Sequence, residues 1–200
     1  MSDFNRLKNG ILGFVIGDAM GVPLEFTERR KEKVIDMLEY GSHNMPKGSW
    51  SDDSSMVIAT MQSIIDNKGI ICYEDIMNNF ILWVEKGKFT SNNKTFGVGS
   101  TTSKALRNYY YREEFIICKN PIMCGIDNFN DNGNGSLMRI LPIAYYSYYK
   151  KITEEDIYKV VKDISSITHR HSISVLGCYI YVLFVIGILN GKKRKMFIKI

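Results

Sequence analysis

Two adjacent carboxylates, Asp52 and Asp53, stand between hydroxyl side chains where a polar segment gives way to an apolar-periodic one. The simplest interpretation is a helix start, because Ser51 is a good N-cap residue and acidic residues in a first turn interact favourably with the helix dipole. The second interpretation is a metal site, because carboxylates and a hydroxyl are the oxygen ligands that Mg²⁺ or Mn²⁺ prefers. The two interpretations are compatible, and the spacing by itself favours the helix start.

A third acidic residue, Glu25, lies between Leu24 and Phe26 in a turn that follows Pro23. A glutamate flanked by apolar residues is either an ordinary surface residue or a partly buried acid. Burial would raise its pKa toward the range that suits proton transfer. The sequence leaves both interpretations open.

Two polar, Gly-rich segments precede expected helices. Residues 96–102 place Gly97 and Gly99 beside hydroxyls at a predicted helix N-terminus, where backbone N–H groups can bind a phosphate. Ordinary capping explains this segment equally well. Residues 131–139 contain several small residues, which suggests a backbone that lies close to another group. A plain turn is the alternative.

Apolar residues recur at helical spacing along most of the chain, and no segment shows β periodicity or an internal repeat. We therefore predict an all-α protein. The predicted helices cover residues 4–21, 53–67, 74–86, 100–112, 153–168 and 173–189. A further helix follows residues 131–139, and we expect Pro142 to kink it. His169 and His171 lie two positions apart and so do not share a helix face, which favours polar end residues over paired ligands.

The first predicted helix carries Gly13, Gly17 and Gly21 at every fourth position. Each glycine inside a helix costs roughly 0.5–1 kcal/mol relative to alanine. We therefore expect another backbone to approach this face closely.

The last predicted helix, residues 173–189, is nearly continuous apolar sequence followed by a basic run at residues 192–195. Its length lies at the lower limit for a membrane span, and the basic flank fits a cytoplasmic end. A helix that is apolar all round is more often the core helix of a larger helical domain. We therefore predict burial rather than a membrane anchor.

The composition fits one globular domain over residues 1–200, with 45% apolar and 24% charged residues. Of the formal net charge of +5, the run at residues 192–195 supplies four charges, so the body is nearly neutral and a nucleic-acid partner is not expected. We interpret this run as a solvated terminus. The four cysteines form no Cys-x-x-Cys pair, which indicates reduced, buried thiols in a cytoplasmic protein. The N-terminal sequence is not that of a signal peptide.

Four stretches of the chain, taken in order, resemble the ADP-ribosylglycohydrolase family, which includes relatives of dinitrogenase-reductase-activating glycohydrolase. They are residues 17–26 (GDAMGVPLEF), 48–56 (GSWSDDSSM), 132–139 (NGNGSLMR) and 168–171 (THRH). The loop at residues 97–102 also resembles the family's loop between the second and third stretches. Each stretch is a moderate signal, whereas their shared order along most of the chain is a strong one.

The resemblance implies an all-α fold around a pair of Mg²⁺ or Mn²⁺ ions. It implies hydrolysis of the bond between ADP-ribose and a protein side chain, often arginine, or a small conjugate. Such hydrolysis passes through an oxocarbenium-like state and needs a positioned water and a base. By position, Ser51, Asp52 and Asp53 would be metal ligands and Glu25 the acid near the reacting centre. The residues expected to bind the substrate are Gly99, Ser100, Asn134, Gly135, Ser136, Met138 and His169.

One departure from the family's pattern affects the functional prediction. The family has a second metal cluster of the Asp-x-Asp-Thr type near the C-terminal end of its domain, whereas residues 172–200 contain no Asp or Glu. A shortened gene product, a binding protein that no longer hydrolyses, and completion by another chain each explain this. The alternatives to a metal-dependent hydrolase are therefore an impaired ADP-ribose-binding protein or remnant and, from residues 173–189, a tail-anchored membrane protein.

Overall fold

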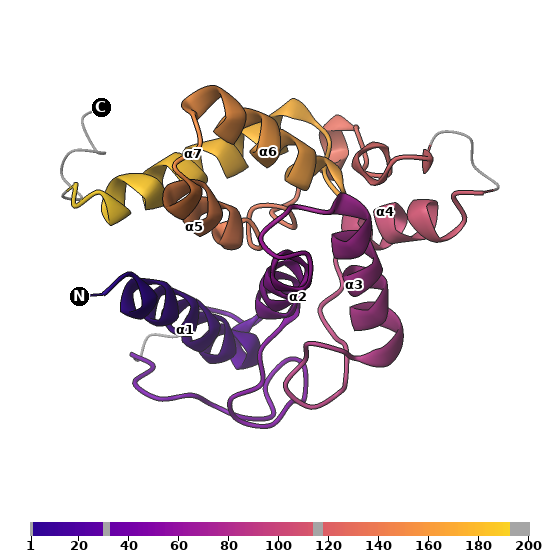
Figure 1. Ribbon diagram of the computed structural model, residues 1–200. Helices are drawn as coiled ribbons and strands as arrows, with labels where there is room; N and C mark the ends of the chain where they lie inside the picture. Colours follow the sequence, from indigo (N-terminus) through magenta and orange to yellow (C-terminus); the bar gives the residue numbers. More distant parts are fainter. Residues whose placement is uncertain (1, 30–32, 114–117, 193–200) are drawn as a thin grey trace.

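The computed structural model describes residues 2–29, 33–113 and 118–192, and this part of the chain is all-α (Figure 1). The α-helices are α1 (Asp3–Gly21), α2 (Asp52–Asp66), α3 (Tyr73–Lys86), α4 (Ser100–Tyr110), α5 (Leu141–Lys150), α6 (Glu154–Ser166) and α7 (Ser172–Leu189). Short 3-10 turns form at η1 (Val22–Leu24), η3 (Pro121–Met123) and η4 (Phe129–Asp131). The all-α prediction is confirmed, because each predicted helix is present with its ends shifted by two residues at most. The prediction of a single domain stays a prediction.

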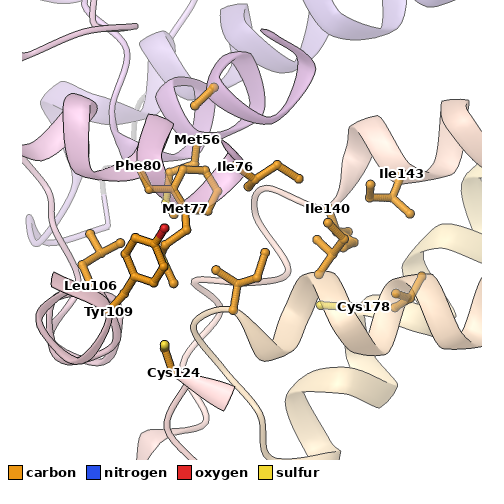
Figure 2. Close-up of a cluster of buried hydrophobic side chains, with 14 of the residues drawn as sticks. Met56, Ile76, Met77, Phe80, Leu106, Tyr109, Cys124, Ile140, Ile143 and Cys178 are labelled. Atoms are coloured by element: carbon orange, nitrogen blue, oxygen red, sulfur yellow. The ribbon is translucent and has the colours of Figure 1, made fainter. Parts of the chain in front are cut away.

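Helix α2 lies in the middle of the molecule and contacts α1, α3 and α5 (Figure 1). Figure 2 shows Met56 of α2 beside Phe80 of α3, with Ile140 and Cys178 on the other side of the same cluster. All four side chains are fully buried. Burial of one large apolar side chain stabilises a fold by roughly 1.5–3 kcal/mol, so this cluster holds α2 firmly in place. The N-terminus of α2, which carries the two adjacent carboxylates, is fixed with it.

Pro142 does not kink α5, contrary to the sequence-based expectation. The helix begins at Leu141, so the proline occupies the first turn. Backbone N–H groups in a first turn have no partner inside the helix, and the missing N–H of proline therefore costs nothing there.

The three glycines of α1 do not mark a close backbone approach among the described residues. A Cβ added at Gly13, Gly17 or Gly21 would meet no atom within 4 Å. The tight contact is one turn earlier, at Gly10, and it is with a side chain: an added Cβ would lie 1.7 Å from the hydroxyl oxygen of Tyr145. The prediction was wrong because spacing on one helix does not report which part of that helix another element crosses.

Helix α7 packs against α5 and α6, and Cys178 and Val182 on its inner side are fully buried. Its outer side carries apolar residues that are half exposed or more: Ile173, Leu176, Ile180 and Ile188. The predicted core position is therefore confirmed for one face of the helix. By length and composition α7 is also the one described helix that could cross a membrane. The basic run lies outside the described residues beyond position 192.

Candidate active site

The acidic residues singled out in the sequence face one cavity. Asp52 and Asp53 occupy the first turn of α2, and Glu25 directly follows η1. The cavity has a volume of about 510 Å³. Its walls are formed by Glu25, Phe26, Asp52, Asp53, Gly97, Gly99, Ser100, Thr101, Thr102, Gly133, Asn134, Gly135, Met138 and His169. The structure therefore brings together segments from five separate parts of the chain.

The start of α2 is fixed by a carboxylate from another helix. Ser51 is the N-cap residue, and its Oγ accepts a hydrogen bond from the backbone N–H of Asp53 at 3.3 Å, which confirms the capping prediction. Ser51 in turn donates from Oγ to Asp18 Oδ1 at 2.7 Å. The backbone N–H groups of Ser51 and Ser54 also donate to Asp18, the latter at 3.0 Å. Asp18 thus bonds the orphan donors of the first turn and ties α1 to α2.

Burial makes the two carboxylates of α2 hard to ionise. Burial, together with the negative charge of Asp53, raises the pKa of Asp52 to about 8. Burial, together with the negative charge of Asp18, raises the pKa of Asp53 to about 6. No lysine, arginine or histidine of the described residues forms an ion pair with either carboxylate. Strongly perturbed acids in a cavity are typical of functional sites.

The donor set is suited to a hard cation, although it is small. Among the residues that the structure describes, no three His, Cys, Asp or Glu side chains are placed to hold a metal ion together. The cavity nevertheless presents two adjacent carboxylates without a cationic partner, and Mg²⁺ is commonly bound by one or two carboxylates with water completing its shell. Ser51 Oγ lies behind Asp53 and is already bonded to Asp18. The match between this site and a hard cation therefore depends on Asp52 and Asp53.

Gly97 allows the loop before α4 to approach Asp52. Its φ is +75°, in the left-handed region, and an added Cβ would lie 2.9 Å from Asp52 Oδ1. Glycine is required here on both counts. Helix α4 then begins at Ser100 with Gly99 as its N-cap residue, which provides no side-chain hydrogen bond to the first turn. The N–H groups of this turn are thus left without a side-chain cap.

The second Gly-rich loop packs against a buried histidine. An added Cβ at Gly135 would lie 2.7 Å from His169 Cε1 and 3.0 Å from Thr102 Oγ1. Burial, reinforced by the positive charge of Arg139, lowers the pKa of His169 to about 4. His169 is therefore a neutral imidazole at physiological pH. Its Nδ1 lies 2.9 Å from Thr168 Oγ1, and the Cε1 and Nε2 atoms of the ring face the loop.

The predicted site residues that line the cavity are Glu25, Asp52, Asp53, Gly99, Ser100, Asn134, Gly135, Met138 and His169. Two others do not line it. Ser51 is buried behind Asp53, as described above. Ser136 is also fully buried, and its hydroxyl accepts hydrogen bonds from Ser165 Oγ at 2.9 Å and from the Cys178 thiol. The side chain of Ser136 thus stabilises the packing of the loop and does not reach the cavity.

Three residues around the site were given no role from the sequence: Asp18, His43 and Arg139. Arg139 is fully buried and has no carboxylate partner among the described residues. Its guanidinium donates to Ile164 O at 2.9 Å and to Thr168 Oγ1 at 2.8 Å, and so fixes the turn that carries His169. A single arginine inside an apolar stretch, as at Arg139, was the available signal.

Comparison with known proteins identifies the kind of molecule to which this site belongs. The family model for ADP-ribosylglycohydrolase matches residues 1–199. The ADP-ribosylarginine hydrolase Tri1 of Pseudomonas putida (strain GB-1) is 29% identical over 203 residues, covering 96% of this chain and 48% of the relative. The ADP-ribosyl-[dinitrogen reductase] glycohydrolase of Rhodospirillum rubrum is 28% identical over 200 residues, covering 96% and 60%.

A solved structure has the same fold. It is the ADP-ribosylglycohydrolase-related protein complex, which matches with a TM-score of 0.71 and 22% sequence identity. The match covers 94% of this chain and 57% of that structure's chain. The present chain thus spans about half the length of the curated relatives described above.

Proposed function

The chain belongs to the ADP-ribosylglycohydrolase family, and from this premise we propose that it removes ADP-ribose from an ADP-ribosylated side chain, with arginine as the preferred acceptor, or from a small ADP-ribosyl conjugate. The activities for which the two curated relatives are named, on ADP-ribosylarginine and on ADP-ribosylated dinitrogen reductase, support this choice. The observation that carries the proposal is that three carboxylates, Glu25, Asp52 and Asp53, face the same cavity as both Gly-rich loops.

The proposed reaction is hydrolysis at the anomeric carbon of the ribose. The bond from this carbon to the guanidine nitrogen breaks, a water oxygen forms the new bond, and the leaving guanidine gains a proton. Glu25 is placed to accept the proton of the attacking water, because its carboxylate lines the cavity and its side chain is 35% exposed. The negative charge in the cavity stabilises the positive charge that develops on the sugar ring.

A divalent cation, Mg²⁺ or Mn²⁺, would be held by Asp52 and Asp53, with water completing its shell. Ser51, whose Oγ contacts Asp18 and Asp53, would support these ligands from behind. Bound there, the cation would orient sugar hydroxyls and a water molecule and act as a Lewis acid. This role accounts for two adjacent acids that form no ion pair with any basic side chain of the described residues.

The two Gly-rich loops are suited to the rest of the substrate. The uncapped first turn of α4, beginning at Ser100, offers backbone N–H groups to the diphosphate. The loop at residues 133–135 lies against His169, whose neutral ring can contact the nucleotide without repelling or attracting charge. With these contacts, a bound substrate would extend from Glu25 to the two Gly-rich loops.

Replacement of Glu25 by glutamine tests the catalytic proposal. We expect the wild-type chain to release ADP-ribose from ADP-ribosyl-arginine in the presence of Mn²⁺ or Mg²⁺. We expect Glu25→Gln to slow release roughly 10²–10⁴-fold, because the amide cannot accept the proton. Chromatographic detection of free ADP-ribose measures the rate. Glu39→Gln, at an exposed position outside the cavity, is the matched control and should retain the wild-type rate.

A second candidate function is ADP-ribose binding without hydrolysis. The observation in its favour is the small acidic donor set, since no group of three His, Cys, Asp or Glu side chains in the described segments is arranged for a metal. Calorimetric titration with ADP-ribose separates the two functions. Saturable binding by a folded protein that releases no ADP-ribose from the conjugate would select the binder, and turnover would select the hydrolase.

Both proposed functions require that the loop at Gly135 does not fill the cavity. We expect Gly135→Ala to weaken ADP-ribose binding by at least about tenfold, because the new methyl group would collide with His169 and Thr102 and push the loop into the cavity. Titration calorimetry measures the change. Gly177→Ala in α7, where an added Cβ meets no atom within 4 Å, controls for the substitution itself. Equal affinities of Gly135→Ala and wild type would remove this loop from the binding site.

A further inference from the structure

His43 contacts the carboxylate that is proposed to act in catalysis. Its Nε2 lies 2.7 Å from Glu25 Oε2, and the two side chains are 16% and 35% exposed. This is the one side-chain hydrogen bond that Glu25 forms with the described residues. His43 does not line the cavity itself. It therefore stands behind Glu25 with respect to a bound substrate.

The imidazole of His43 also joins two walls of the site. Its ring lies edge-on to Phe26, with the centroids 5.8 Å apart and the planes at 67°. On another side it packs against Phe96, at 5.0 Å and 46°. Phe26 follows Glu25, and Phe96 precedes the loop that approaches Asp52 through Gly97. One side chain thus touches both the turn that carries the proposed base and the loop that is proposed to bind the diphosphate.

The backbone around His43 is held against η1. An added Cβ at Gly41 would lie 2.0 Å from the carbonyl oxygen of Pro23, so only glycine fits this contact. The neighbouring Ser42 donates from Oγ to Val22 O at 3.1 Å. The position of His43 is therefore determined by main-chain contacts to the segment that leads into Glu25.

The turn at Glu25 is closed by its own hydrogen bonds, and His43 supports it from outside. Thr27 donates from its backbone N–H and from its Oγ to Leu24 O, at 3.2 and 2.6 Å. Phe26 has a φ of +58°, in the left-handed region that is unfavourable for a residue with a Cβ, and its side chain is 93% exposed. An exposed side chain in this conformation gains little from packing, so contacts from outside the turn add to the two hydrogen bonds that close it. Among the described residues, His43 makes such contacts with both Glu25 and Phe26.

We propose that His43 is a positioning residue for Glu25. The hydrogen bond from His43 fixes the position of Glu25 Oε2 and leaves Oε1 as the carboxylate oxygen that accepts a proton from water. The ring of His43 packs against Phe96 and so holds the Glu25 turn at a fixed position relative to the loop that follows Phe96. The catalytic part of this inference rests on the proposed hydrolase function. The hydrogen bond and its effect on the Glu25 carboxylate do not.

The kinetic test compares His43→Ala and His43→Gln with wild type. We expect His43→Ala to lower kcat about 10–100-fold, because a displacement of a reacting group by about 1 Å can cost that much. KM and the Kd for ADP-ribose should stay within about threefold, since His43 does not touch the substrate. His43→Gln should recover most of kcat, because its amide nitrogen can donate to Glu25. Lys47→Ala, which removes an exposed ion pair with Asp36 from the same loop, should match wild type.

A spectroscopic test is independent of turnover. In protein labelled with ¹³C at the glutamate carboxyl carbons, the Glu25 resonance is assigned by its loss in Glu25→Gln. We expect His43→Ala to shift this resonance and His43→Gln to leave it near its wild-type position. An unshifted resonance in His43→Ala overturns the inference, even if the wild type hydrolyses its substrate. A shift in a wild type that releases no ADP-ribose keeps the contact and overturns the hydrolase function alone. Equal losses of kcat and ADP-ribose affinity in His43→Ala, without rescue by glutamine, would indicate general damage to the fold and would also overturn it.

Discussion

Mn²⁺ is expected to raise the melting temperature of the wild-type chain, and Asp52→Asn and Asp53→Asn are each expected to abolish this increase. A ligand that binds only the folded state stabilises it by RT ln(1 + [L]/Kd), roughly 2.7 kcal/mol at a hundredfold excess over Kd. For a chain of this size that corresponds to a shift of roughly 5–10 °C. The described donors form a small set, so binding should be weak and the shift is expected at high ion concentration. Thermal melts in Mn²⁺ and in chelator measure it.

The same melts distinguish a metal site from a helix cap. If Asp52 and Asp53 only interact with the helix dipole, each mutant loses about 0.3–1 kcal/mol of stability with or without metal. Asp66→Asn, the same substitution at the exposed C-terminal end of α2, is the matched control and should keep the full Mn²⁺ effect. A wild-type melting temperature that does not respond to metal would contradict the proposed cation site.

The helices were predictable because their signals are local. Apolar spacing and N-cap signals depend on neighbours within one or two helical turns. Ser51 and Thr153, for example, both cap their helices in the structure. The errors concern contacts between elements. Gly13 and Gly17 have the spacing of a close-packed face, yet the tight contact is at Gly10 with the Tyr145 side chain. Nothing in the sequence of α1 specifies where a side chain of α5 reaches it.

The residues that line the cavity could be predicted from the ordered motifs. The residues that hold the lining residues in position, such as Asp18 and His43, could not. Asp18 bonds to Ser51 across 33 positions of sequence, and His43 bonds to Glu25 across 18. Neither pair has a helical or strand spacing that would suggest contact. Arg139 lay within a recognised motif, but its buried bonds to a turn 25 or more residues away depend on the packing of α5 against α6. Residues that line a site can be found from a sequence motif. Residues that position the lining residues can be found only when the fold shows which segments are in contact.

The free energy of unfolding in chelator is expected to contain a contribution from Asp52 that falls as the pH rises from about 4 to about 8. The folded-state pKa of Asp52 is about 8 and its ordinary value is 3.8, so over this range the folded state binds more protons than the unfolded state. Raising the pH then favours the unfolded state. Asp53, with a pKa of about 6, adds a smaller contribution over the lower part of the same range.

Comparison of wild type with Asp52→Asn isolates the contribution of Asp52 together with its coupling to Asp53, because titrating groups farther away affect both proteins equally. Each pKa unit corresponds to about 1.4 kcal/mol, so the contribution reaches a few kcal/mol by pH 8 and exceeds the roughly 0.3–1 kcal/mol that the mutant loses at the helix dipole. We therefore expect Asp52→Asn to be more stable than wild type at pH 8 and similar to it near pH 4, as measured by urea unfolding. A stability difference that does not change between these pH values would show that the Asp52 carboxylate is hydrated and ionised, and the buried acidic site would have to be abandoned.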